Sequence, residues 1–259
     1  MFRQLLILAA VLVVALASPV VERDRRIVGG YDNVAGQVPW AVSLRTLAGF
    51  HFCTGSVVSA WYVLTGGKIN ESHCVFGRTP SGIHLILGRV TLDGSGGINR
   101  QGFRVVTHPS YNADTMGFDL GLVQTSVVIL FSTTVQSIFL SNTFVGAGAA
   151  SKSSGWGSTS SELGPTSNNL RTLDTTTLSN AECRSRHSYW NAERITDNNI
   201  CTDNGVGQGF CQTGAGGSLV WNAQLIGVAS WNVPCALGFP DVYVRVSALR
   251  PWIISIIGE

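Results

Sequence analysis

The stretch that decides the fold is Cys211-Gln212-Thr213-Gly214-Ala215-Gly216-Gly217-Ser218-Leu219-Val220. It joins a glycine-rich turn to an apolar segment that runs from Leu219 to Trp231. Glycine permits the backbone conformations that tight turns demand, and a short apolar run bounded by turn residues is typical of a buried β-strand. The stretch therefore predicts a turn that leads directly into a strand.

Further short apolar segments recur between turn-rich stretches along the whole chain. They span residues 38–44, 55–65, 83–90, 103–106, 120–128 and 242–246. Many short strands separated by Gly, Ser and Asn predict an all-β barrel or sandwich. Two helices are expected: a short one over 181–186, capped by Ser179 or Asn180, and a terminal one that begins at Pro251. Residues 155–169 are predicted to form a mobile surface loop.

Size and composition fit an extracellular protein of this class. The chain has 259 residues, enough for one large domain or two packed halves. Charged residues make up 12% of it, about half of the usual share in globular proteins, and 30 residues are glycine. A chain with this composition is rich in turns and has a rather neutral surface.

The first 26 residues predict a leader and a short propeptide. An apolar run from Leu5 to Leu16 ends in a small-x-small pattern, so residues 1–17 are expected to be a signal peptide. Residues 18–26 are polar, and cleavage between Arg26 and Ile27 would release them. The remaining chain has 13 basic and 13 acidic side chains, which gives no support to a nucleic-acid or anionic-membrane partner. No later segment is long enough to span a bilayer.

Six cysteines behind a secretory leader predict three disulfides, although six cysteines allow fifteen pairings. Their spacing is unlike that of a zinc site, and no metal is expected. Asn70-Glu71-Ser72 is the one glycosylation sequon of the chain, and a sugar on Asn70 is expected to lie beside the functional cleft.

Four separated segments, in this order and spacing, resemble the chymotrypsin-like serine proteases over the whole of residues 27–259. They are Ile27-Val28-Gly29-Gly30, the stretch from Cys53 to Thr65 that leads to His73-Cys74, Asp119 to Val123, and residues 211–220, joined by Gly155-Trp156-Gly157, Ser230-Trp231 and Trp252-Ile253. The resemblance implies a trypsin-like fold of two packed antiparallel six-stranded β-barrels with a short C-terminal helix. It also implies a cleft between the barrels, no cofactor and a monomeric state. The disulfides that it implies are Cys53–Cys74, Cys183–Cys201 and Cys211–Cys235.

The family's chemistry uses a serine that attacks a carbonyl carbon, a histidine that takes its proton, and an aspartate that orients the histidine. Here the nucleophile position holds Ala215, whose methyl group cannot attack. Loss of the nucleophile lowers turnover by roughly a million-fold in such triads. Thr213 stands where the family has an oxyanion-hole glycine, and Gly214 where it has the aspartate that pairs with the new amino terminus after cleavage. Ser218, in place of a proline, is three residues away from the nucleophile position.

The other two triad positions differ in how clearly they map. Asp119 corresponds to the orienting aspartate. The histidine position has two candidates, because five extra residues lie between Thr65 and Cys74. His73 corresponds when the alignment is anchored on the cysteine, and Lys68 when it is anchored on the strand.

The primary specificity pocket maps by motif as well. Gly209 is expected at its base, Ser230, Trp231 and Asn232 along its wall, and Asp241 at its back. Gly209 together with Asp241 resembles the arthropod collagenolytic, or brachyurin-like, branch. Asn232 replaces a glycine and is expected to narrow the entrance. Asp241 either attracts a basic side chain or is a buried ion in a vestigial cavity, with a shifted pKa.

These features indicate a secreted, inactive protease homologue that binds a protein partner or a protease inhibitor. The alternative is an active secreted endopeptidase of chymotrypsin or collagenase type, rescued by a hydroxyl such as that of Ser218 or Thr213. A third hypothesis is a product that is not under selection.

Overall fold

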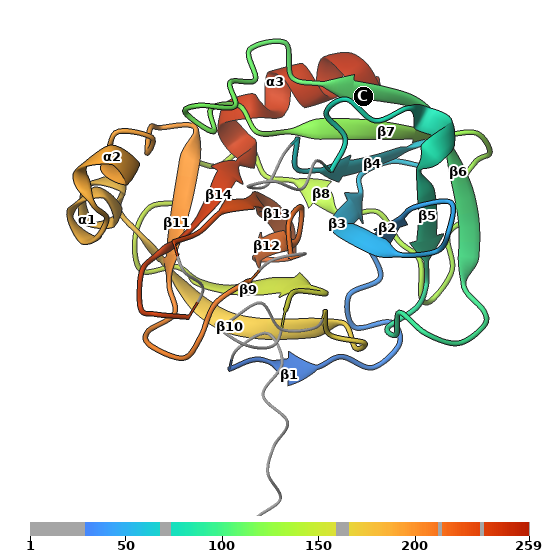
Figure 1. Cartoon of the computed structure of the whole chain (residues 1–259), viewed down its shortest axis with the longest axis horizontal. Helices are drawn as coiled ribbons and strands as arrows, with labels where there is room; N and C mark the ends of the chain where they lie inside the picture. The colour runs from blue at the N-terminus through green and yellow to red at the C-terminus, as the bar shows by residue number, and fades with distance from the viewer. Residues whose placement is uncertain (1–28, 68–73, 159–165, 212–213, 234–235, 259) are drawn as a thin grey trace, which may run out of the picture.

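The computed structural model describes residues 29–67, 74–158, 166–211, 214–233 and 236–258. Two β-barrels lie side by side in it, one built from each half of the chain (Figure 1). The predicted trypsin-like architecture is therefore confirmed. Within the described residues no helix is long and apolar enough to cross a membrane.

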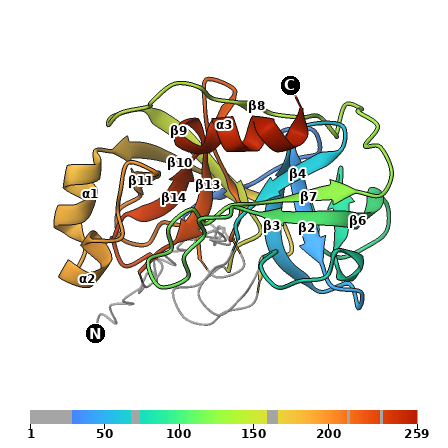
Figure 2. The same ribbon diagram turned by 90° about the horizontal axis from the view of Figure 1, so that it is seen from above.

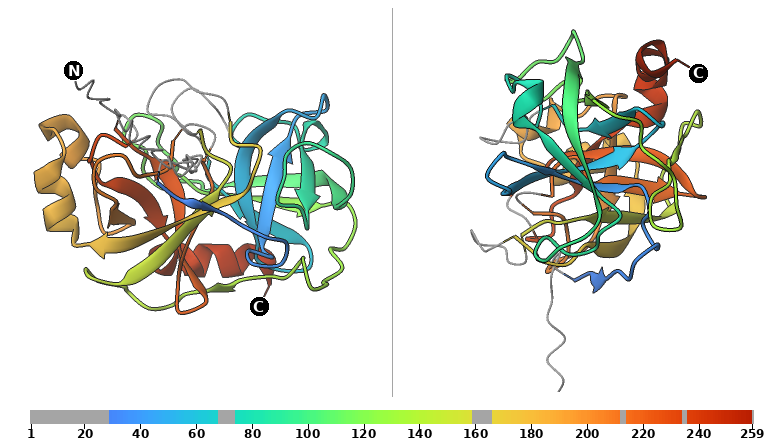
Figure 3. Two further views of the ribbon diagram at one scale, coloured as in Figure 1. Left: turned by 90° about the horizontal axis from the view of Figure 1, so that it is seen from below. Right: turned by 90° about the vertical axis from the view of Figure 1, so that its right-hand side faces the viewer.

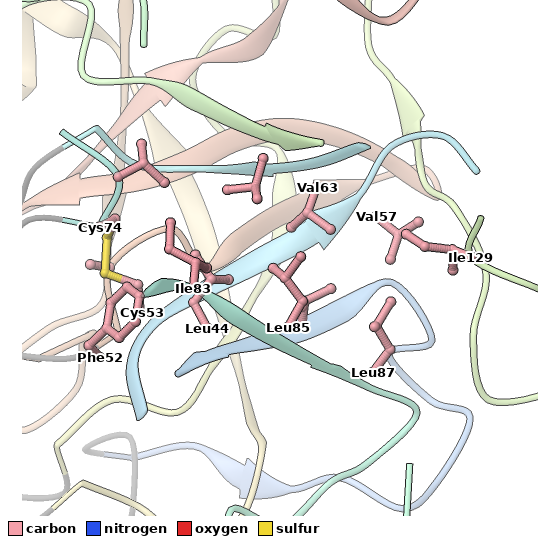
Figure 4. Close-up of a cluster of buried hydrophobic side chains, with 14 of the residues drawn as sticks. Leu44, Phe52, Cys53, Val57, Val63, Cys74, Ile83, Leu85, Leu87 and Ile129 are labelled. Atoms are coloured by element: carbon pink, nitrogen blue, oxygen red, sulfur yellow. A yellow bond between two sulfur atoms is a disulfide. The ribbon is translucent and has the colours of Figure 1, made fainter. Parts of the chain in front are cut away.

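The first barrel closes in the order β2-β3-β4-β7-β6-β5, and all of its strand pairs are antiparallel. The strands are β2 (Ala41–Arg45), β3 (His51–Val57), β4 (Tyr62–Thr65), β5 (His84–Leu87), β6 (Ile98–Thr107) and β7 (Gly121–Thr125). A 3-10 turn, η1 (Pro80–Gly82), precedes β5. Alternate side chains, such as Leu85 and Leu87, point into the barrel and fill its core (Figure 4).

The second barrel forms a ring in the order β9-β10-β11-β14-β13-β12, closed by pairing of β12 with β9. The strands are β9 (Ala150–Gly155), β10 (Arg171–Leu178), β11 (Asn199–Asp203), β12 (Ser218–Trp221), β13 (Gln224–Trp231) and β14 (Asp241–Arg245). Two short strands add to it: β1 (Tyr31–Asp32) pairs antiparallel with β10, and β8 (Phe139–Leu140) pairs parallel with β13.

Strands β9, β10 and β11 were not predicted from apolar runs. They are rich in Ser, Thr and Asn, yet most of their side chains are buried. Their hydroxyls bond to one another, as between Ser154 Oγ and Thr172 Oγ1 at 2.8 Å. The prediction of a surface loop over 155–169 was wrong at its start, because Trp156 is buried and its indole donates to the carbonyl of Val90 at 3.3 Å.

Three helices complete the described part of the fold. The first is α1 (Asn180–Arg186), where Ser179 is the N-cap and its hydroxyl accepts from the amide of Glu182 at 3.1 Å. A short helix, α2 (Tyr189–Ala192), follows it. The terminal helix, α3 (Val246–Ile257), starts before the predicted Pro251, which lies inside it. Its buried residues pack with side chains of both barrels, and Figures 2 and 3 show it lying across them.

Two of the implied disulfides are present. Cys53 bonds to Cys74 and Cys183 bonds to Cys201. Cys211 is also disulfide-bonded, and its expected partner, Cys235, lies outside the described residues.

The two barrels meet at the glycine-rich turn. The amide of Thr54 in β3 donates to the carbonyl of Ala215 at 2.8 Å, and the amide of Gly216 donates to the carbonyl of Ala229 in β13 at 3.0 Å. Gly216 has φ +74°, and a Cβ there would lie 2.1 Å from the carbonyl oxygen of Thr54 and 2.3 Å from Thr65 Oγ1. The turn therefore needs glycine for its backbone angle and for its space.

We expect Gly216→Ala to lower the free energy of unfolding by about 3 kcal/mol or more, because it combines an unfavourable φ with overlap against backbone. Gly148→Ala is the matched control: its φ is also positive, at +81°, but nothing lies within 4 Å of the added Cβ. It should cost only about 1–2 kcal/mol. Denaturant unfolding of both variants measures the difference, and equal losses would show that the joint tolerates a side chain.

Candidate functional site

Ala215 lies in the joint between the barrels, and its side chain is 2% exposed. The methyl group packs in the core cluster of the first barrel, with Cys53 and Cys74. The turn around it is held by two further backbone bonds, from Gly214 to the carbonyl of Cys211 and from Gly217 to that of Gly214. The position has a fixed backbone but offers no nucleophilic atom.

Ser218, the nearest downstream hydroxyl, is already engaged. It is the first residue of β12, is buried, and accepts a hydrogen bond from Trp40 Nε1 at 3.1 Å. Its backbone is paired with Ser154 and Val228. The Ser218 hydroxyl therefore fixes Trp40 against the start of β12.

Asp119 is fully buried just before β7. Its Oδ2 accepts a hydrogen bond of 2.6 Å from the hydroxyl of Ser230, which reaches it from the end of β13 in the other barrel. Burial, together with the charges of Asp119 and Asp114, raises the pKa of the Tyr111 phenol. The structure thus joins Asp119 and Ser230, two of the predicted site residues, across the seam.

Both candidates for the histidine position, His73 and Lys68, lie outside the described residues, as does the sequon residue Asn70. The segments on either side are described. A Cβ on Gly67 would lie 3.0 Å from Asp119 Oδ1, and one on Gly66 would lie 3.9 Å from Cys74 Sγ. The described residues on either side of 68–73 therefore lie beside Asp119 and the first disulfide.

Two residues of the site were missed in the sequence. Met116 and Phe118 both have φ +54°, a conformation that is strained for a bulky side chain. Phe118 stacks on His108 at a centroid distance of 4.7 Å, directly before Asp119. Met116 packs against the cluster that contains Trp231. Packing thus fixes the loop before Asp119 at both positions. Positive φ angles are expected from sequence at glycine and asparagine, so these two could not be predicted.

Three of the residues predicted for the pocket, Gly209, Asn232 and Asp241, come together. Gly209 lies against Asp241, since a Cβ on Gly209 would be 3.1 Å from Asp241 Oδ2. That oxygen accepts 2.6 and 2.8 Å hydrogen bonds from Asn204 Nδ2 and the amide of Phe210. Asp241 is 2% exposed. Asn204 was not predicted, because nothing in its sequence context distinguishes it from a turn residue.

Asn232 contacts two other members of this group. Its Nδ2 donates to the carbonyl oxygen of Phe210, and its side chain also hydrogen-bonds to Asp241. Its side chain therefore links Phe210 to Asp241. Asp241 is therefore a buried group that is contacted by three donors of the protein itself.

Comparison with known proteins agrees with this geometry. Residues 27–253 match the family model described as Trypsin. The chain is similar to trypsin I-P38 of Gallus gallus, at 36% identity over 96% of both chains, and to trypsin alpha of Drosophila erecta, at 33% over 97% of both. Trypsin delta of Drosophila melanogaster is 33% identical over 90% of this chain and 88% of its own.

The chain belongs to the trypsin family.

The chain has that family's two-barrel fold, together with the Cys53–Cys74 and Cys183–Cys201 disulfides and the hydrogen bond between Ser230 and Asp119. Thr213 and the cleavage residues Arg26 and Ile27 lie outside the described residues. Among the residues that are described, no group of His, Cys, Asp and Glu is arranged to hold a metal ion.

The ionisation of Asp241 is set mainly by its burial. Loss of hydration disfavours the carboxylate and raises the pKa to about 8, against the opposing effect of its hydrogen-bond donors. The folded protein thus prefers a protonated Asp241, whereas the unfolded chain ionises it near the ordinary pKa of 3.8. The resulting stabilisation is complete below about pH 4 and is lost as the pH rises towards 8.

We expect Asp241→Asn to remove this pH dependence. In the unchanged protein the free energy of unfolding should fall between pH 4 and 8, by up to about 1.4 kcal/mol per pH unit. Asparagine resembles the protonated acid in shape, and its single carbonyl oxygen can accept the two donors that Oδ2 accepts, Asn204 and Phe210. Denaturant unfolding at several pH values tests this, with Asp174→Asn, at an exposed site, as the control. Parallel pH profiles for the variant and the unchanged protein would contradict it.

Proposed function

We propose that this protein is a secreted, catalytically inactive trypsin homologue that acts by binding a protein partner or a protease inhibitor. The observation that carries the proposal is Ala215, a buried methyl group at the position of the nucleophile. Acyl transfer in this family begins with attack by that side chain, and a methyl group has neither a lone pair nor an acidic proton.

Other residues near Ala215 support the proposal that more than the nucleophile has been lost. Gly214 provides no carboxylate for a new amino terminus, and Thr213 replaces a glycine of the oxyanion loop. The side chain of Asn232 hydrogen-bonds to the carbonyl of Phe210 and to Asp241, so both of these groups are already engaged within the protein. Ser218 is bonded to Trp40 and gives no support to a rescued endopeptidase.

The scaffold supports a binding role. Both barrels have closed hydrogen-bond ladders and buried cores, and α3 packs on both of them. The two described disulfides and the apolar leader fit secretion. A rigid surface of this kind can bind a protein that recognises trypsins without cleaving it, so the partner classes are protease inhibitors and the proteins that trypsins contact. A stable stoichiometric complex recovered from the native secretion, and identified by mass spectrometry, tests this role.

The purified protein, incubated with a reactive organophosphonate that labels active-site serines, should show no covalent adduct by intact-mass spectrometry. An active trypsin treated in parallel provides the positive control. The experiment is repeated after exposure to a protease that cuts after arginine, so that an uncleaved propeptide cannot explain a negative result. Stoichiometric labelling of any serine, blocked by a competitive inhibitor, would overturn the proposal.

Restoring the hydroxyl alone should not restore the enzyme. We expect Ala215→Ser to remain at least about a hundredfold below an active trypsin in kcat/KM. A β-branched Thr213 does not readily adopt the backbone conformation that glycine allows, and an oxyanion-hole N–H that is directed elsewhere costs that much in acyl transfer. Cleavage of chromogenic peptides with basic and with aromatic side chains before the scissile bond measures it. Activity equal to that of a trypsin would show that Thr213, Gly214 and Asn232 are compatible with catalysis, and that only the nucleophile has been lost.

A further inference from the structure

A cavity of about 290 Å³ lies where residues 31–40 pack against strands β9, β10 and β12. Val38, Trp40 and Val220 form the apolar part of its lining. The indole N–H of Trp40 already donates to Ser218 Oγ at 3.1 Å, so it is not available to a ligand. An apolar cavity of about 150 Å³ holds one benzene molecule. This one therefore has room for a bicyclic aromatic ring.

The polar part of the lining is a series of hydrogen bonds that run in one direction. Asn33 Nδ2 donates to the carbonyl of Leu170 at 3.1 Å, which places Asn33 Oδ1 towards Thr172. Because Oδ1 can only accept, the Thr172 hydroxyl donates to it, at 3.0 Å. The single proton of that hydroxyl is thereby used. The 2.8 Å bond between the hydroxyls of Ser154 and Thr172 is therefore donated by Ser154.

Ser154 Oγ ends this series and can still accept a hydrogen bond. No donor among the described residues bonds to it, although Ser154 is only 5% exposed. Its side chain points out of the second barrel, because the neighbouring Ser153 accepts from Tyr243 inside that barrel and side chains alternate along a strand. Lys152 and Ser154 thus share the outer face of β9, and both line the cavity. A ligand gains a hydrogen bond from Ser154 Oγ only if it carries an N–H or O–H group.

The lining has one charged residue, and its charge is already paired. Lys152 Nζ forms an ion pair with Asp174 and donates to the hydroxyl of Tyr31 at 2.9 Å. Tyr31 and Lys152 are both exposed, so the cavity opens to solvent on this side. An anionic ligand would meet the carboxylate of Asp174 beside the ammonium group. The electrostatics of the cavity therefore favour a neutral ligand.

We propose that this cavity binds a neutral bicyclic aromatic group with an N–H or O–H donor, such as an indole. The ring packs against Trp40 and the two valines, and its donor bonds to Ser154 Oγ. Ala215, Gly209 and Asp241 do not line the cavity, so it is separate from the site between the barrels. This binding does not depend on whether the protein is catalytically active.

The first test is a calorimetric titration of the unchanged protein with indole and with benzofuran. The two molecules have nearly the same shape, but benzofuran has an oxygen atom in place of the N–H group. We expect indole to bind at one site with a Kd of about a millimolar or tighter, as is reasonable for a ligand of this size. Benzofuran should bind about fivefold more weakly or worse, since it leaves Ser154 Oγ without a donor. Equal affinities, or no saturable binding of indole, would overturn the proposal.

The second test places the ligand in this cavity. Ser154→Ala should lower the affinity for indole to that for benzofuran and leave the affinity for benzofuran nearly unchanged, because only the hydrogen bond is lost. Ser151→Ala is the matched control: Ser151 is also a buried serine of β9, but its hydroxyl donates to the carbonyl of Ala149 and it does not line the cavity. This variant should keep the preference for indole. The same preference in Ser154→Ala would show that the ligand does not bond to Ser154.

Titration with N-acetyltryptophanamide separates two sources of the aromatic group. Binding that competes with indole indicates that the tryptophan side chain of a partner can enter the cavity. Binding of indole alone indicates a site for a free small molecule. Either result supports the site, whereas N-acetyltryptophanamide that binds without displacing indole would show that the cavity does not select for this ring.

Discussion

The hydrogen-bonded joint between β3 and the 214–217 turn is the contact on which the rest of this structure depends. The carbonyl of Ala215 accepts from Thr54, the amide of Gly216 donates to Ala229, and the carbonyl of Gly217 accepts from the Ala229 amide. These three bonds join the first barrel to β13 of the second. They set how Asp119, from one barrel, meets Ser230, from the other. This joint therefore determines how the residues of the site lie relative to one another.

The strands could be predicted from the sequence where their buried side chains are apolar. The segments around β2 to β7 and β12 to β14 were marked by apolar runs, because alternate side chains there fill the cores. Strands β9, β10 and β11 could not be found in that way. Their buried faces carry hydroxyls that are satisfied by partners far away in sequence, as between Thr172 and Asn33. Periodicity analysis treats such residues as solvent-facing, so only the family resemblance indicated these strands.

The site could be predicted where a single residue type decides the chemistry. Ala215, Asp119 and the pocket positions Gly209 and Asp241 were all identified from motifs, and the structure brings Asp119 to Ser230 and Gly209 to Asp241. What could not be predicted depends on contacts made across the fold. The bond from Asn204 to Asp241 and the φ of Met116 and Phe118 are set by tertiary packing. A shifted pKa of Asp241 was one of the two expectations from the sequence, and its upward direction follows from burial in the fold.

The glycine-rich turn separates what the fold needs from what catalysis needs. At Gly216 a Cβ would overlap Thr54 and Thr65, and at Gly217 it would lie 2.7 Å from the carbonyl oxygen of Ser154. Both positions are glycine. The positions that differ from the pattern that the family resemblance implies are Thr213, Gly214, Ala215 and Ser218. Of these, Ala215 and Ser218 have side chains that the structure places in packing roles. The turn thus retains the two glycines that the joint between the barrels requires, which is what the proposed binding function needs from it.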